Sequence, residues 1–174
     1  MSNKLSSKTG SPKMDKALLI KAVKGGGELP IITEVDLSGN NYQGADLAGG
    51  SFNKVNFSNA DLSDAYLKEC NFIECDFSAA ILDRADLTLA SFINPIFNRT
   101  HMHHAVFSYS NFIDGQFVGV DMTSSSMLNT SFINPDMRDA CLASIKTENT
   151  NFLNAKLDNA DFSHSEQYRS NFIE

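Results

Sequence analysis

The sequence has no tryptophan, only three cysteines and four prolines, and no long apolar run. A membrane-spanning helix needs about 20 consecutive apolar residues, and no stretch of this chain approaches that length. The run Leu18-Leu19-Ile20 is too short, and too interrupted by lysine, for the core of a signal peptide. An odd number of cysteines without an export signal favours reduced thiols. We therefore expect a cytoplasmic protein.

The chain is also short of positive charge, with a net charge of −7. This charge argues against general affinity for nucleic acid or for anionic membranes, so neither is expected as a partner. Its distribution is uneven. Residues 1–29 carry six lysines against two carboxylates, whereas residues 30–174 carry eight lysines and arginines against 19 carboxylates. The sequence predicts an acidic body with a basic N-terminal segment.

The N-terminal segment divides into two parts. Residues 1–13 are rich in serine and lysine and are predicted to form a disordered tail, with a secretion or transit signal as the alternative. Residues 14–29 predict a short capping helix and a Gly-rich linker, with Asp15 as N-cap and Gly25-Gly26-Gly27 as the stop. The apolar face of this helix comprises Leu18, Leu19, Ala22 and Val23. A helix this short is unstable alone in water, so we expect it to dock over the start of the following domain.

The domain at residues 30–174 is dominated by a period of five without insertion or deletion. A large apolar residue stands at every fifth position from Ile32 to Phe172, and all 13 phenylalanines fall in this phase. Only Thr147 and Gln167 break the series, and each needs a hydrogen-bond partner or access to solvent. The position two residues earlier is mostly small, and residues two apart in extended backbone point to the same side. Each block of five therefore offers one large and one small inward residue.

A longer period of twenty lies over the period of five. It is carried by the phrases Asn71-Phe72-Ile73, Ser91-Phe92-Ile93, Asn111-Phe112-Ile113, Ser131-Phe132-Ile133, Asn151-Phe152-Leu153 and Asn171-Phe172-Ile173. Four blocks thus make one turn of a four-sided coil, with turns stacked about 4.8 Å apart by sheet hydrogen bonds. Residues 30–174 give about seven such turns at twenty residues each.

Several blocks resemble a known repeat. They are Ala45-Asp46-Leu47-Ala48-Gly49, Ala60-Asp61-Leu62-Ser63-Asp64, Ala85-Asp86-Leu87-Thr88-Leu89 and Ala160-Asp161-Phe162-Ser163-His164. These blocks are similar to the A(D/N)LXX pattern of the pentapeptide-repeat family, and the resemblance covers residues 30–174. It implies an all-β fold, a right-handed quadrilateral β-helix. The spacing predicts four sides, whereas the handedness is implied by the resemblance alone.

An aliphatic column is the first candidate site. Its members follow the central residue on one side of the coil and point outward: Ile73, Ile93, Ile113, Ile133, Leu153 and Ile173. Exposed aliphatic patches usually mark contact surfaces, although branched residues also favour β-structure for its own sake. We predict a rigid scaffold that binds a protein partner, with a homodimer through this side as one form.

The C-terminal end of the coil is a second possible dimer contact. The sequence stops inside a repeat, so the last turn would leave backbone groups and Phe172 uncovered, and such edges favour association. A truncated sequence is the alternative explanation.

The resemblance also implies a different function. Some members of the family protect DNA gyrase by imitating duplex DNA. The candidate acidic residues lie on one side of the predicted coil: Asp61, Asp64, Asp83, Asp121 and Asp161. Against this function, the carboxylates are spread over all four sides, and the inserted loops of the quinolone-resistance members are missing.

A histidine cluster is the one candidate metal site. His101 and His103 flank the inward Met102, with Asp121 one turn after and Asp83 one turn before. Imidazoles and carboxylates in this arrangement could hold a divalent metal. A solvated surface cluster with raised histidine pKa values is commoner, so we predict neither metal nor cofactor.

The remaining reactive groups give no catalytic site. Cys70 and Cys75 occupy small inward positions and are expected to fill the core, while Cys141 points outward as a weak candidate for a reactive thiol. The sequence has no glycine-rich phosphate loop and no nucleophile elbow. A smooth four-sided rod also lacks the concavity that active sites need. We therefore predict that the protein is not an enzyme.

Overall fold

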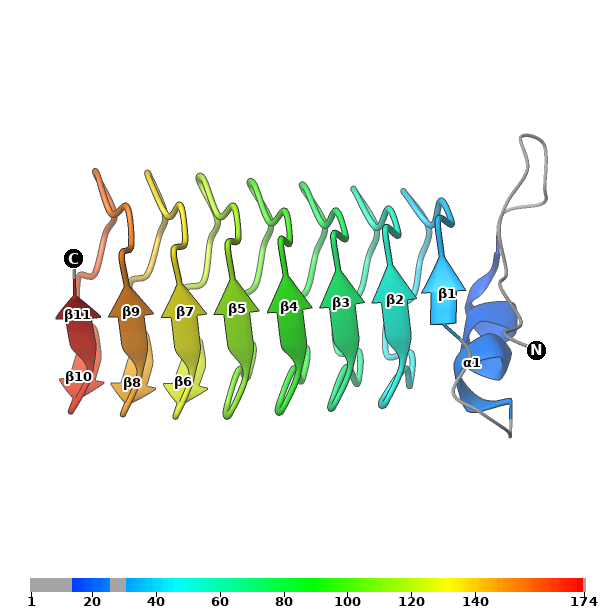
Figure 1. Cartoon of the computed structure of the whole chain (residues 1–174), viewed down its shortest axis with the longest axis horizontal. Coiled ribbons are helices and arrows are strands. Elements are labelled where there is room, and N and C mark those ends of the chain that lie inside the picture. The colour runs from blue at the N-terminus through cyan, green and yellow to red at the C-terminus, as the bar shows by residue number, and fades with distance from the viewer. Residues whose placement is uncertain (1–13, 26–30, 174) are drawn as a thin grey trace.

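The computed structural model describes residues 14–25 and 31–173. Residues 31–173 form a parallel β-solenoid of about seven turns, with one short helix at its N-terminal end (Figure 1). This arrangement confirms the β-helix expected from the sequence. The predicted disordered tail at residues 1–13 and most of the Gly-rich linker lie outside the described residues.

We number the four sides of the coil by their central residues within one turn: first side Phe92, second side Phe97, third side Met102 and fourth side Phe107. The first side is an eight-stranded parallel sheet. Its strands are β1 (Ile31–Thr33), β2 (Ser51–Asn53), β3 (Asn71–Ile73), β4 (Ser91–Ile93), β5 (Asn111–Ile113), β7 (Ser131–Ile133), β9 (Asn151–Leu153) and β11 (Asn171–Ile173). On the fourth side, β6 (Ser126–Leu128), β8 (Lys146–Glu148) and β10 (Glu166–Tyr168) form a second sheet.

The register between turns is twenty residues throughout the solenoid. Phe72 pairs with Phe92 on the first side, and Asp61 bridges to Ile81 on the third side. The backbone N–H of Ile81 donates to the Ala60 carbonyl at 2.9 Å. Each side chain therefore lies directly above the residue twenty positions earlier, and equivalent residues form columns.

The corners of the coil share one backbone conformation. Every fifth residue from Glu34 to Arg169 has a positive φ, and 24 of these residues are not glycine. This left-handed region is uncommon for other residue types. Most corners close a β-turn, as where the Ala85 N–H donates to the Leu82 carbonyl at 3.0 Å. Because the conformation recurs whatever the side chain, we attribute it to the hydrogen bonds between turns.

Stacked phenylalanine rings fill the core. Phe72, Phe92 and Phe112 stack with ring centroids 4.7 and 4.6 Å apart, close to the about 4.8 Å that separates parallel strands. Phe97 meets Phe92 edge-on from the second side at 5.4 Å. Aromatic pairs of these geometries contribute about 0.5–1.5 kcal/mol each beyond area burial. The stacked phenylalanine column of the first side therefore stabilises the core beyond simple burial.

Several of the small inward positions are occupied by serine or threonine, whose hydroxyl groups are buried. Thr100 is fully buried, and its Oγ1 donates to the Phe77 carbonyl 23 residues earlier at 2.7 Å. Ser125 makes the equivalent bond to the Met102 carbonyl at 2.7 Å. A buried hydroxyl without a partner would destabilise the fold by about 1–3 kcal/mol. Because the register between turns is constant, a backbone carbonyl 23 residues earlier is in place to accept each of these hydrogen bonds.

The two polar residues in the large inward column differ in their surroundings. Thr147 is only 3% exposed, and its Oγ1 accepts a hydrogen bond from the Ser170 hydroxyl at 2.8 Å. Gln167 is exposed, and its amide donates to the Ser165 hydroxyl at 3.1 Å. Thr147 is thus buried with a hydrogen-bond partner, whereas Gln167 reaches solvent.

Helix α1 (Lys16–Lys24) packs on the N-terminal turn of the solenoid (Figure 1). The predicted N-cap is confirmed, since Asp15 Oδ1 accepts a hydrogen bond from the Leu18 N–H at 2.8 Å. Leu19 and Val23 are buried against the core. Lys24 forms an ion pair with Asp46 at 2.8 Å. The sequence was wrong about one member of the apolar face, because Leu18 is 50% exposed.

Candidate interaction surfaces

The aliphatic column predicted from the sequence is continuous in the structure. Its six residues stand in register at the last position of β3, β4, β5, β7, β9 and β11. Ile93 is 38% exposed and Leu153 is 37% exposed. Neighbours at strand spacing cover the remainder of each side chain. The column is thus a narrow apolar stripe that runs along most of the first side.

The first side also carries no charge on its flat face. In residues 31–173, the outward residues of its eight strands are serine, asparagine, threonine, isoleucine and leucine. The other sides carry charged residues at the equivalent positions, for example Asp76 on the second, Asp121 on the third and Lys68 on the fourth. The core of a protein interface is typically depleted of charged residues. The first side matches that composition.

Two exposed residues that sequence reasoning missed border this side. Leu89 and Tyr109 are 54% and 50% exposed, and they occupy successive corners where the fourth side meets the first. They directly precede β4 and β5, the strands that carry Ile93 and Ile113. The sequence did contain a signal for them, because both are large and apolar at a corner position. The equivalent corners of the turns before and after are the polar residues Glu69 and Asn129. These corners add apolar surface beside the serine and asparagine column, at the edge of the first side that lies away from the aliphatic column.

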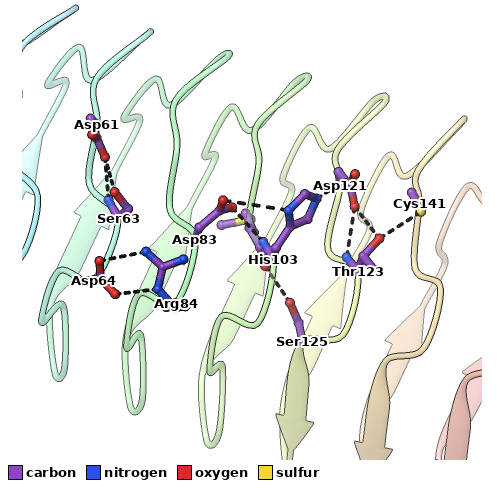
Figure 2. A network of polar contacts seen from close by, with 11 residues as sticks. Asp61, Ser63, Asp64, Asp83, Arg84, His103, Asp121, Thr123, Ser125 and Cys141 are labelled. Atoms are coloured by element: carbon purple, nitrogen blue, oxygen red, sulfur yellow. Dashed lines mark hydrogen bonds and ion pairs between the residues drawn. The ribbon is translucent and has the colours of Figure 1, made fainter.

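The acidic residues named from the sequence all lie on the third side or its corner, and Figure 2 shows all of them except Asp161. Several of their carboxylates contact a cation or a hydrogen-bond donor. Arg84 contacts Asp64 through two nitrogens at 2.7 and 2.8 Å. These hydrogen bonds from the Arg84 guanidinium lower the pKa of Asp64. Asp61 accepts a hydrogen bond from the Ser63 N–H at 3.0 Å, and Asp161 accepts one from the Ser163 N–H at 2.8 Å.

His103 lies between Asp83 and Asp121, as Figure 2 shows. Its Nε2 is 2.9 Å from Asp121 Oδ2, while its Nδ1 is 3.8 Å from Asp83 Oδ2. The hydrogen bond to Asp121 raises the pKa of His103, against the opposing effect of burial. For Asp121, burial raises the pKa, but the hydrogen bonds from His103 and Thr123 outweigh it and the pKa is lowered. The ring of His101 lies 5.9 Å from that of His103.

The three cysteines divide as expected. Cys70 and Cys75 are buried, and burial raises the pKa of each thiol to about 12. The Cys70 Sγ lies 3.0 Å from the Leu47 carbonyl, the same interaction that buried serine and threonine make. Cys141 is half-buried on the third side, with its Sγ 3.2 Å from Thr123 Oγ1.

The C-terminal end is the most open part of the solenoid. Phe172 is 42% exposed and Ile173 is 52% exposed. Together with Phe152 and Leu157 they line a shallow groove.

Within the described residues, no helix has the length and hydrophobicity that a membrane span requires.

Comparison with known proteins identifies the family. The family model described as pentapeptide repeats matches residues 31–68, 60–94 and 85–123 with eight copies, which together cover more than half of the sequence. The chain belongs to the pentapeptide-repeat family. No curated protein matches this pentapeptide-repeat chain.

Solved structures share its fold. Full-length QnrB1, a plasmid-mediated fluoroquinolone resistance protein, is 13% identical with a TM-score of 0.55, covering 79% of this chain and 84% of QnrB1. A trypsin-treated QnrB1 variant is 19% identical with a TM-score of 0.54, covering 80% and 74%. HetL from the cyanobacterium Nostoc is 16% identical with a TM-score of 0.38, covering 79% and 76%. At these identities the two QnrB1 structures show a shared fold alone.

The cysteine environments predict selective labelling. In the native protein, Ellman's reagent should modify only Cys141, because Cys70 and Cys75 are buried and stay protonated. All three thiols should react in denaturant. Absorbance of the released thiolate counts the modified groups, and Cys141→Ser should abolish the native reaction. Rapid modification of more than one thiol per native chain would contradict the buried placement.

Proposed function

We propose that this pentapeptide-repeat protein is a rigid, non-enzymatic scaffold that binds a protein through its first side. The observation that supports this most strongly is the combination of a continuous aliphatic column with a flat face free of charge. Rigidity supports the same function. Each turn is hydrogen-bonded to the next, so the surface loses little conformational freedom when it binds.

The size of the column limits the type of contact. From Ile73 to Ile173 it spans five turns, or about 24 Å at strand spacing, and it is one side chain wide. A stable interface buries about 800 Å² on each partner. The contact must therefore include the flanking serine and asparagine column and the corners at Leu89 and Tyr109.

A second copy of the chain is the partner that fits this surface. In a two-fold contact the same patch occurs on both subunits and must be self-complementary. Asparagine and serine can both donate and accept hydrogen bonds, and an uncharged face does not repel its own copy. A dimer through the first side would bury the aliphatic columns against each other.

Charge placed in the column should separate the copies. We expect Ile93→Asp/Ile113→Asp to convert a dimer into a monomer, because two carboxylates would lie at the centre of the contact. Light scattering coupled to size-exclusion chromatography measures the mass. The matched control is Asn98→Asp/Val118→Asp, which adds two carboxylates to the second side of the same two turns and should leave the dimer intact.

Three outcomes would contradict the first-side dimer. A wild-type chain that is monomeric at high micromolar concentration would exclude it. If the control variant were monomeric to the same extent, the dissociation would reflect added charge in general and not a contact at the first side. A dimer that persists in Ile93→Asp/Ile113→Asp but is lost in Phe172→Asp would show that the subunits meet at the C-terminal end instead. Far-UV circular dichroism checks that each variant remains folded.

The alternative function is modulation of DNA gyrase by DNA mimicry, and the five acidic residues gathered along the third side favour it. Their spacing weighs against it. Asp61, Asp121 and Asp161 share one column, but they are three and two turns apart, or about 14 and 10 Å. Phosphates in DNA follow at about 3.4 Å along each strand. Arg84 further offsets the charge of Asp64.

A supercoiling assay tests this alternative directly. We expect the wild-type protein at micromolar excess to leave the supercoiling activity of DNA gyrase unchanged, because the acidic column is sparse. The comparison variant is Asp61→Lys/Asp83→Lys/Asp121→Lys. Inhibition by the wild type that is lost in this variant would favour DNA mimicry over the scaffold function.

A further inference from the structure

The histidine cluster on the third side brings three metal-ligating side chains together. His101 and His103 stand on either side of the inward Met102, so both imidazoles project from the outer face. Asp121 is the partner of His101 in the next turn. The twenty-residue register therefore places a carboxylate beside the two histidines.

The distances within this cluster are close to those of a zinc site. One ligand atom from each of His101, His103 and Asp121 lies within 4.8 Å of the other two. Zinc–ligand bonds of about 2.1 Å place two ligands of a tetrahedral ion about 3.4 Å apart. His103 Nε2 and Asp121 Oδ2 are 2.9 Å apart, so this pair must separate by only about 0.5 Å to reach that tetrahedral spacing. The 4.8 Å limit exceeds this spacing by about 1.4 Å, so the His101 imidazole must move toward the other two ligands by no more than about that distance.

Neighbouring groups surround two of the three ligands, and hydrogen bonds orient Asp121 (Figure 2). Asp83 Oδ1 accepts a hydrogen bond from the backbone N–H of His103 at 3.0 Å. The other oxygen of Asp83 faces Nδ1 of the His103 ring. Thr123 donates to Asp121 Oδ1 through its N–H at 3.0 Å and its hydroxyl at 2.6 Å. The atoms left for a metal, Nε2 of His103 and Oδ2 of Asp121, face each other. Outer hydrogen bonds of this kind orient ligands in metal sites.

We propose that His101, His103 and Asp121 form a binding site for a divalent cation of the zinc type on the third side. Two imidazoles and one carboxylate suit zinc, nickel and copper, whereas magnesium prefers oxygen ligands alone. The carboxylates of Asp83 and Asp121 supply negative charge next to the cation. Three protein ligands leave one position of a tetrahedral ion open to solvent. The site is independent of the surface assigned to protein binding.

Isothermal titration calorimetry of the full chain with zinc chloride tests the site. We expect one zinc ion per chain, no measurable heat with magnesium chloride, and at least about tenfold weaker zinc binding in His101→Ala and in His103→Ala, since each removes a direct ligand. The matched controls are His104→Ala and His164→Ala, which remove third-side histidines outside the cluster. Both should bind zinc as the wild type does.

The sulfur of Cys141, in the turn after Asp121, is a competing ligand, and one further variant separates it from the proposed set. Cys141→Ser should retain wild-type affinity, because the thiol contacts Thr123 and lies outside the three-residue cluster. Zinc binding that survives in His101→Ala/His103→Ala, or that is lost in Cys141→Ser, would overturn the assignment. Far-UV circular dichroism of each variant separates loss of a ligand from loss of fold.

Discussion

The hydrogen bonds between successive turns are the interaction on which the rest of this structure depends. They set a register of twenty residues that holds on all four sides, as in the bonds from Leu62 N–H to the Ile81 carbonyl and from Ile81 N–H to the Ala60 carbonyl. Because the register never changes, every residue lies above an equivalent residue one turn earlier. The chain therefore behaves as a set of columns, and the properties of each side follow from what fills them.

The columns explain both the core and the surfaces. Inside, rings stack at the strand spacing, and the buried hydroxyls at small inward positions, such as that of Thr100, meet a carbonyl 23 residues earlier. Outside, one side carries an aliphatic column without charge, while the third side carries carboxylates, an arginine and the histidine cluster. A surface of either kind arises without a loop or a cleft. It needs only suitable residues at stacked positions in neighbouring turns.

Much of this could be predicted from the sequence, because a fixed period determines which residues are inside. The large and small inward positions, the capping helix with Asp15 as N-cap and the aliphatic column are all confirmed as structural features. The sequence could not show which contacts individual side chains make. Spacing placed both Asp83 and Asp121 near His103, but rotamers decide that Nε2 faces Asp121. The partner of Thr147 and the exposure of Leu18 likewise depend on local packing and docking that spacing does not encode.

Removal of one turn tests the twenty-residue register most directly. Deletion of residues 91–110 takes out four whole blocks, so all later columns stay in register, and the account predicts a cooperative urea transition by circular dichroism at a somewhat lower midpoint. Deletion of residues 91–111 removes one more residue and moves inward positions outward in every later turn, so that transition should be lost. Equal midpoints and amplitudes for the two variants would contradict the account.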